Sequence, residues 1–361
     1  MRWLPLLLLA LAACEGPTDD DDSVGEPGPP AVPGECEDAL QDPWTADLLA
    51  GLDAVGGLDS AYWADHEADA FATVLFAEVD AGTCAVLHRG EVRAYGLLPE
   101  PPSMLTPLFG YQLPWTDGPD WVQPLGGASQ QPAEWVDWLT DSGVDRATFL
   151  PAHEVTGVGF PVSALSHLQI AVHEGFHVDV QAPAWFGRPE HPWPSWDQQP
   201  NRSQLPNCYA DAVMEQTRLA NALEAAWARD LPGALEEYDG FWDARGLRRL
   251  DLAGTPVTAA DGSSIDCEHA EAILELEEGL AEYAAWAMLR DAGGATDAEV
   301  LTSLRATTSE PFYKYGAGQA LLVQALDPAG FPQWIQTIAA SDSHTAGSIE
   351  AATREAINAL R

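Results

Sequence analysis

Basic residues are scarce in this sequence. Its 361 residues include 16 lysines and arginines against 56 aspartates and glutamates, which gives a formal net charge of −40. Such an acidic surface repels phosphate backbones and anionic lipid headgroups, and this argues against nucleic-acid binding and against direct binding to a membrane surface. No internal repeat is visible either. The hydrophobic content of 46% and the 14 tryptophans nevertheless supply a sizeable core, so we expect a globular protein.

Cysteine is also sparse, with five residues and no C-x-x-C spacing of the kind that binds metals. The first cysteine, Cys14, closes the run "MRWLPLLLLALAAC", which is too short to span a bilayer and is typical of a signal peptide. The four others form an even number, which in an exported chain suggests disulfides. Their order favours the pairs Cys36–Cys84 and Cys208–Cys267, while other pairings or four buried thiols are the alternatives.

The segment Leu11-Ala12-Ala13-Cys14 resembles the lipobox of bacterial lipoproteins. The resemblance implies a signal peptide over residues 1–13, lipidation of Cys14 and a place in the cell envelope, facing the periplasm or the cell surface. The lipid anchor would then be the protein's only contact with the membrane. Residues 15–35 are acidic and rich in Pro and Gly, so we expect 14–35 to form a disordered tether. An ordinary secreted protein with an incidental cysteine is the alternative.

The remaining chain changes character near Ser163. Before it, in residues 36–162, the β-rich runs 71–79 and 83–92 read as a hairpin. After it, in residues 163–361, the pattern is mainly helical, with helices predicted over 208–229, 232–246, 267–291, 310–326 and 346–360. This order predicts an α+β fold. A Trp- and Pro-rich insert at 182–207 interrupts the helical part, either as a lid over a substrate or as packing.

The stretch "AVHEGFHVDV" (171–180) carries the clearest chemical signal. Ser163 is a suitable N-cap for a helix running to about Val180, with an apolar stripe formed by Leu165, Leu168, Val172 and Phe176. On the adjacent face, His173 and His177 lie one turn apart and can hold one Zn²⁺ ion. Glu174 follows the first histidine, where it can accept a proton from a zinc-bound water.

Two histidines need a third protein ligand, and two types of zinc site can be set aside. A metzincin-type site requires glycine and histidine where this chain has Val180 and Pro183. An aspartate ligand such as Asp261 follows a Gly-Thr pair, but its spacing is poor.

The segment "LELEEGLAEYAAW" (274–286) provides a better third ligand. Its order of residues resembles the E-G-x-A-x-Y of gluzincin metallopeptidases, the group of thermolysin-like and aminopeptidase-type enzymes. The resemblance implies a zincin-like fold and Glu278 as the third zinc ligand. Gly279 would let the two helices approach closely, and Glu282 either orients a ligand histidine or lies on the surface. The simpler interpretation of these glutamates is a solvated acidic face.

Residues 310–326, "EPFYKYGAGQALLVQAL", resemble the Y-x-K-G-A segment of aminopeptidase-like gluzincins. The match implies that Tyr313 donates a hydrogen bond to the developing oxyanion, with Tyr315 as the second choice. A buried aromatic pair is the alternative. Tyr315 stands in place of the lysine, the insert before Glu278 is long, and "GVGFPV" (157–162) replaces the G-x-M-x-N segment, so aminopeptidase specificity is not implied.

We therefore expect an exported, zinc-dependent hydrolase with one Zn²⁺ per chain, which cleaves peptides or proteins by zinc-activated water. One alternative is a surface-binding lipoprotein without catalytic activity, with a zinc ion or without metal. Another is an amidase that acts on a cell-wall amide, because water attack on any amide uses the same residues.

Overall fold

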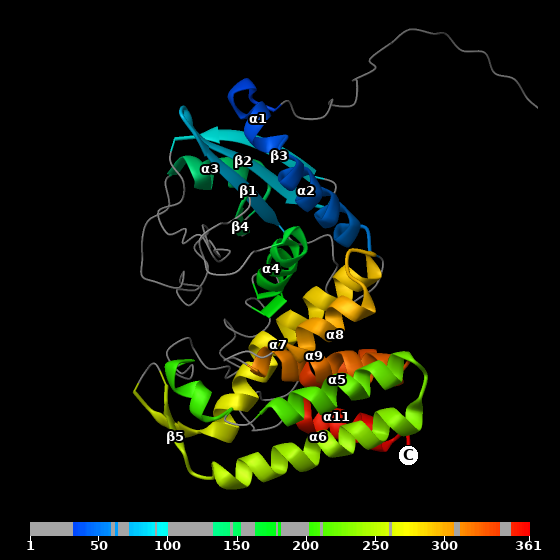
Figure 1. The fold of residues 1–361 in the computed structure, drawn as a ribbon. Helices are drawn as coiled ribbons and strands as arrows, with labels where there is room; N and C mark the ends of the chain where they lie inside the picture. The colour runs from blue at the N-terminus through cyan, green and yellow to red at the C-terminus, as the bar shows by residue number, and fades with distance from the viewer. Residues whose placement is uncertain are drawn as a thin grey trace, which may run out of the picture. The chain divides into compact units, whose positions relative to one another are not determined.

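Helices make up most of the described chain, and a small sheet lies in its N-terminal part (Figure 1). The described residues belong to one compact unit, Ala31–Arg361. The expected mixed α+β composition is confirmed for this part of the chain. The computed structural model describes residues 32–58, 62–63, 72–90, 92–99, 133–144, 147–152, 163–177, 180–181, 202–209, 212–259, 262–306, 311–339 and 348–361.

Several predictions concern residues outside this part. Cys14, the signal peptide and most of the expected tether lie outside it, as does the insert up to residue 201. The last residues of the insert form the 3₁₀ helix η5 (Arg202–Asn207), and the 3₁₀ helix η1 (Gly34–Cys36) begins slightly before the expected end of the tether. No helix of the described residues combines the length and the apolar content needed to cross a membrane.

The sheet has the strand order β3-β2-β1-β4. Its strands are β1 (Thr73–Val79), β2 (Gly82–Arg89), β3 (Val92–Leu98) and β4 (Thr148–Pro151). β1 and β2 pair as the predicted antiparallel hairpin, whereas β4 returns parallel to β1 with Thr148 opposite Thr73. β3 extends the hairpin beyond the run 83–92, into residues for which no strand was predicted.

Both faces of this sheet are covered, so β1 is buried over residues 73–77 and β2 over residues 83–88. Side chains alternate between the faces along each strand. Leu75 and Val86 pack in one cluster with α2 (Pro43–Gly56), which begins at the N-cap Asp42. Val74 and Leu87 lie in the other cluster with Trp135 and Leu139 of α3 (Ala133–Asp141), a helix that was not predicted.

The C-terminal part contains the expected helices. They are α4 (Ala164–Phe176), α5 (Val213–Trp227), α6 (Leu231–Asp251), α7 (Cys267–Asp291), α9 (Phe312–Leu326) and α11 (Ser348–Asn358). Two further helices, α8 (Asp297–Arg305) and α10 (Phe331–Ala339), and the hairpin of β5 (Pro256–Thr258) and β6 (Ser264–Asp266) were not predicted. α7 is buried along most of its length and forms the centre of the helical part (Figure 1).

Two disulfides fasten these elements in the pairing that the sequence order favoured. Cys36 is bonded to Cys84 of β2, and Cys208 is bonded to Cys267 at the first turn of α7. The second bond joins the end of η5 to α7. Together they confirm the pairing and exclude four free thiols.

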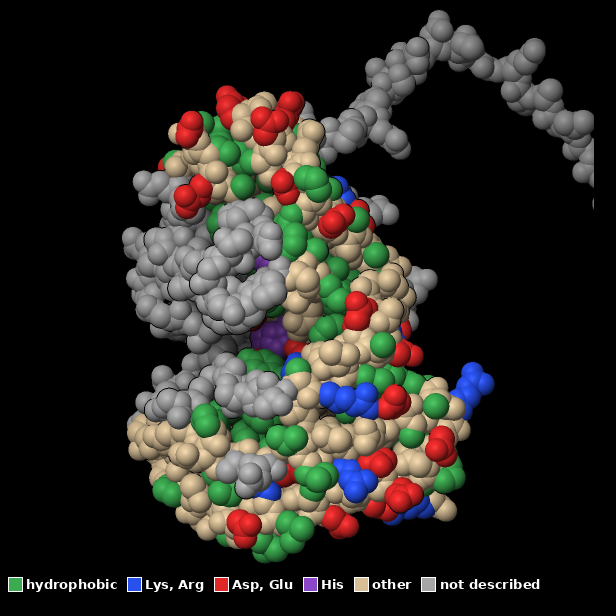
Figure 2. Space-filling model, viewed as in Figure 1, with side chains coloured by type: hydrophobic (Ala, Val, Ile, Leu, Met, Phe, Trp, Pro, Cys, Tyr) green, Lys and Arg blue, Asp and Glu red, His purple; other side chains and the backbone are tan. Residues whose placement is uncertain are grey.

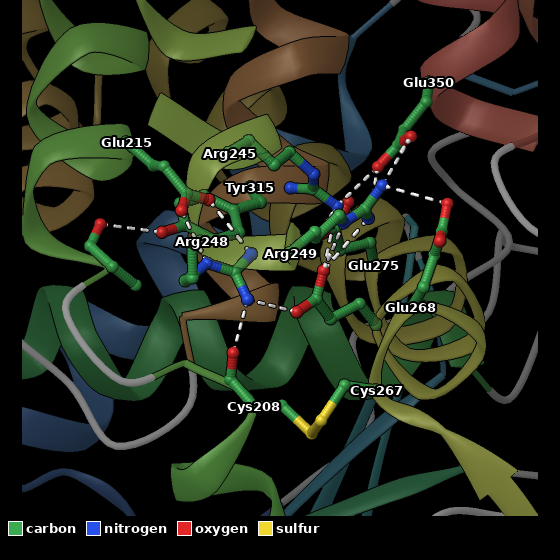
Figure 3. A network of polar contacts seen from close by, with 12 residues as sticks. Cys208, Glu215, Arg245, Arg248, Arg249, Cys267, Glu268, Glu275, Tyr315 and Glu350 are labelled. Atoms are coloured by element: carbon green, nitrogen blue, oxygen red, sulfur yellow. Dashed lines mark hydrogen bonds and ion pairs between the residues drawn. A yellow bond between two sulfur atoms is a disulfide. The ribbon is translucent and has the colours of Figure 1, made fainter. Parts of the chain in front are cut away.

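A buried ion-pair network fixes α7 against α6 (Figure 3). Arg248 binds both carboxylate oxygens of Glu215, at 2.5 and 3.0 Å, and also pairs with Glu271. Arg245, which is 0% exposed, lies 2.6 Å from Glu275. Removing one partner of such a pair is strongly destabilising, because it leaves the other charge buried and uncompensated. The other members of the network are Arg249, Glu268 and Glu350.

Candidate metal centre

Helix α4 and its C-cap residue place His173 and His177 in the interior. Its N-cap is Ser163, as expected, and the Ser163 Oγ accepts a hydrogen bond from the Ser166 amide at 3.1 Å. The α-helix ends at Phe176 rather than near Val180, because the chain from His177 to Gln181 adopts wider π-helical geometry at its described residues. Such turns occur frequently at functional sites. Histidine side chains, with acidic ones beside them, are visible on the face drawn in Figure 2.

The predicted ligands His173, His177 and Glu278 converge on one point. The two Nε2 atoms lie 3.1 Å apart, and each lies 3.3 Å from the Glu278 Oε2. All three residues are buried, with 6%, 5% and 4% of their surface exposed. A tetrahedral Zn²⁺ ion with bonds of about 2.0–2.1 Å holds its ligand atoms roughly 3.3–3.4 Å apart. The donor set and its spacing therefore fit a metal ion.

Glu278 reaches this point because it continues a stripe of carboxylates along α7. Glu271, Glu275, Glu278 and Glu282 follow one another at steps of four, three and four residues, so they share one face of the helix. The first two pair with arginines of α6. Glu278 and Glu282, farther along, face the histidines of α4. A solvated acidic face was the wrong interpretation of the glutamates in 274–286, because all four of these residues are at most 5% exposed.

Gly279 brings α7 close to α9 and not to the histidine helix. A Cβ on Gly279 would lie 2.5 Å from the Cα of Gly316. Successive residues of a helix point about 100° apart, so when Glu278 faces α4 its neighbour faces elsewhere. The crossing places Tyr313 and Lys314, the turn before Gly316, beside the candidate metal centre.

Each histidine has an oxygen atom beside its second ring nitrogen. The His177 Nδ1 lies 2.5 Å from the Gln181 Oε1, whereas the His173 Nδ1 makes no hydrogen bond within the described residues and lies 3.5 Å from the Glu282 Oε2. A carboxylate or amide oxygen in this position fixes the orientation of the ring and leaves Nε2 for a metal. The buried position of Glu282 excludes the surface alternative. Gln181 was missed, although it follows His177 by one helical turn.

Glu282 is held by several donors. The Gln169 Nε2 donates to it at 2.5 Å, the Trp286 Nε1 at 2.8 Å and the Lys314 Nζ at 2.7 Å. Lys314 also donates to the Ser303 Oγ at 3.0 Å. Burial raises the pKa of Glu282, but Lys314 and His173 outweigh it and hold that pKa well below its usual range. Gln169 and Lys314 had no recognised signal in the sequence.

The electrostatic field of the centre favours positive charge. Burial alone lowers the pKa of His173, but Glu278 and Glu282 outweigh it and raise this pKa to about 10. Glu278 raises the pKa of His177 against burial in the same way. Two buried imidazoles that attract protons this strongly also attract a metal cation, which competes for the same lone pairs.

The other predicted catalytic residues occupy different surroundings. Glu174 lies between the two histidines in the sequence, is half-buried and interacts electrostatically with both. The Tyr313 ring lies 5.6 Å from the His173 ring, measured between centroids. Tyr315 is fully buried, and its hydroxyl donates to the Ala212 carbonyl at 2.8 Å. The structure thus brings Tyr313 to the centre and places Tyr315 in the core of the helical part.

No protein-family model, curated protein or solved structure matches this chain. The chemistry of the candidate metal centre is therefore inferred from its own residues.

Proposed function

We propose that the protein is an exported, lipid-anchored zinc metallopeptidase of the gluzincin type, with a zincin-like fold. One observation carries the proposal: two imidazole nitrogens and one carboxylate oxygen lie 3.1–3.3 Å apart in a buried cluster. Two histidines and a glutamate are the ligands of catalytic zinc sites, which keep the fourth position for water or substrate. The site would hold one Zn²⁺ per chain.

Glu174 is the general base in this proposal. A bound zinc ion would lower the pKa of its water to about 7 and polarise the carbonyl of the substrate. Glu174 takes the proton of the attacking water and delivers it to the leaving amine. A purely structural metal site does not need such a carboxylate next to its first ligand.

Tyr313 supports the reaction as a hydrogen-bond donor to the oxyanion. Its ring is beside His173, and it lies in the first turn of α9, the helix that the Gly279–Gly316 contact holds against α7. A donor held in place by the fold costs no reorganisation when negative charge develops on the carbonyl oxygen.

The proposed location rests on the lipobox-like segment ending at Cys14 and on the disulfides. Two disulfides in one chain are typical of an oxidising compartment outside the cytoplasm. A lipidated Cys14 would hold the catalytic part at the envelope.

The test compares the zinc-loaded protein with its Glu174→Gln variant on a peptide library. We expect cleavage by the wild-type protein, loss of cleavage by a chelator and its return with zinc. Glu174→Gln should keep the zinc and lose roughly 10²–10⁴-fold in rate. Equal cleavage by both proteins would contradict the assigned base. Cleavage of cell-wall amides without any peptide cleavage would assign the same residues to an amidase.

A further inference from the structure

Gln181 connects the second histidine to the segment that carries the third ligand. Its Oε1 lies 2.5 Å from the His177 Nδ1, and its Nε2 donates to the Glu277 carbonyl at 2.7 Å. The side chain is 0% exposed. Both polar atoms of the amide therefore have partners inside the protein. One partner is the predicted ligand His177, and the other is the residue before the predicted ligand Glu278.

The first contact selects the form of the imidazole. An amide oxygen can only accept a hydrogen bond, so it requires a proton on the His177 Nδ1. A neutral imidazole protonated at Nδ1 has its lone pair on Nε2, the atom that lies 3.3 Å from Glu278. Gln181 thus favours the tautomer that can bind a metal, and it fixes the plane of the ring.

The second contact fixes the distance between the two helices that supply the ligands. Glu277 immediately precedes Glu278, so its carbonyl belongs to the turn of α7 that presents the third ligand. The bond from Gln181 anchors the chain after α4 to this turn. On the other side of the cluster, Gln169 of α4 makes an equivalent bond to Glu282 of α7.

Glutamine suits this position because its side chain accepts at one atom and donates at the other. Leucine has nearly the same size and offers neither contact, whereas an ionised glutamate accepts from histidine and cannot donate to the Glu277 carbonyl. These two substitutions separate the contact with His177 from the contact with Glu277.

We propose that Gln181 is a positioning residue for the metal, which holds His177 in its metal-binding tautomer and sets its position against Glu278. The inference rests on the metal site of the proposed function and extends it to a residue outside the ligand set. The role concerns metal affinity, so it is tested without any measurement of hydrolysis.

The experiment measures Zn²⁺ affinity, by competition with a chromophoric chelator, for the wild type and for the variants Gln181→Leu and Gln181→Glu. Gln181→Leu should bind Zn²⁺ about 10–100-fold more weakly. Gln181→Glu keeps the acceptor for the His177 Nδ1 and loses the donor to the Glu277 carbonyl, so its Zn²⁺ affinity should fall by less than that of Gln181→Leu. The absorption spectrum of bound Co²⁺ should change in Gln181→Leu and be preserved in Gln181→Glu.

A matched control is available in Gln216. Its side chain is also buried, and its Nε2 donates to the carbonyls of Leu304 and Ala306 at 2.5 and 2.6 Å, away from the metal ligands. Gln216→Leu should lower the thermal stability of the metal-free protein and leave Zn²⁺ affinity unchanged. This separates a general loss of packing from a specific effect on the metal.

The inference is overturned if Gln181→Leu binds Zn²⁺ as tightly as the wild type, or if Gln216→Leu weakens binding equally. Equal weakening in Gln181→Leu and Gln181→Glu would also overturn it, because the contact with His177 would then not matter. A wild type that binds no zinc overturns both this inference and the proposed function. A wild type that binds zinc without cleaving peptides would contradict the proposed peptidase activity and leave this inference standing.

Discussion

Gly279 and Gly316 face each other where α7 crosses α9, so closely that a Cβ on Gly279 would lie 2.5 Å from the Gly316 Cα. Neither helix has a side chain at this crossing. Because Tyr313 and Lys314 lie within one turn of Gly316, the crossing determines how near they come to His173 and Glu282. The packing of these two helices thus decides which side chains of α9 lie beside the candidate metal centre.

The first prediction concerns this crossing. In Gly316→Ala the new methyl group meets the backbone carbonyl of Glu275, which cannot move aside as a side chain can. We expect the free energy of unfolding to fall by about 3 kcal/mol, measured by urea denaturation. Gly246→Ala is the control, because Gly246 lies in α6 with open space around it, and it should gain roughly 0.5–1 kcal/mol. Similar changes in both variants would contradict a close crossing.

The second prediction separates the two tyrosines. Tyr313→Phe should lower kcat/KM by about 10²–10³-fold, because it removes a donor to the oxyanion. Tyr315→Phe removes the hydrogen bond to the Ala212 carbonyl, so it should cost about 1 kcal/mol of stability and leave kcat/KM nearly unchanged. Peptide hydrolysis measures kcat/KM, and thermal unfolding measures the stability, of both variants. The reverse pattern would assign the catalytic role to Tyr315.

A third prediction concerns the ion-pair network of α6 and α7. Arg245→Met removes a fully buried guanidinium and leaves Glu275 without its closest ion-pair partner, with only the Gln319 amide of the described residues still donating to it. We expect a loss of about 3–5 kcal/mol in the free energy of unfolding. The double variant Arg245→Met with Glu275→Gln should recover part of this loss, since it no longer buries an unpaired charge. A double variant less stable than Arg245→Met would contradict this account of the pair.

The fourth prediction concerns pH. The pKa of His173 is raised to about 10, so in the metal-free protein this residue is protonated at pH 7. A metal requires the neutral imidazole, so binding of Zn²⁺ must release protons. Affinity should therefore rise as the pH increases from 6 to 9. Calorimetry in buffers of different ionisation enthalpy measures the protons released, and a binding enthalpy independent of the buffer would exclude the linkage.

The sequence allowed local features with a strong pattern to be predicted. The hairpin of β1 and β2, the N-cap Ser163 and the bounds of α7 follow from alternation, capping and periodicity, and the structure agrees with them. His173 and His177 were recognisable because their spacing is local. The contact of these histidines with Glu278 joins residues far apart in the sequence. Glu278 was therefore predicted as the third ligand only from the resemblance of a short motif.

The rest required tertiary structure. Glu271 and Glu275 are charged residues whose burial depends on arginines in another helix, so it could not be predicted from local sequence. Lys314 is the only lysine in the sequence and Gln181 is one of many glutamines, and the role of each follows from what it touches. The helices α8 and α10 are short, and a local pattern of nine residues seldom distinguishes a helix from a loop.

The central claim is that His173, His177 and Glu278 together hold one metal ion. The most direct test is the zinc content per chain, measured by elemental analysis of the wild type and of Glu278→Gln, with His269→Ala as the control from the same helix. We predict about one zinc per chain in the wild type and the control, and none retained by Glu278→Gln after dialysis. A folded wild type that takes up no zinc, or a Glu278→Gln variant that keeps it, would contradict the account.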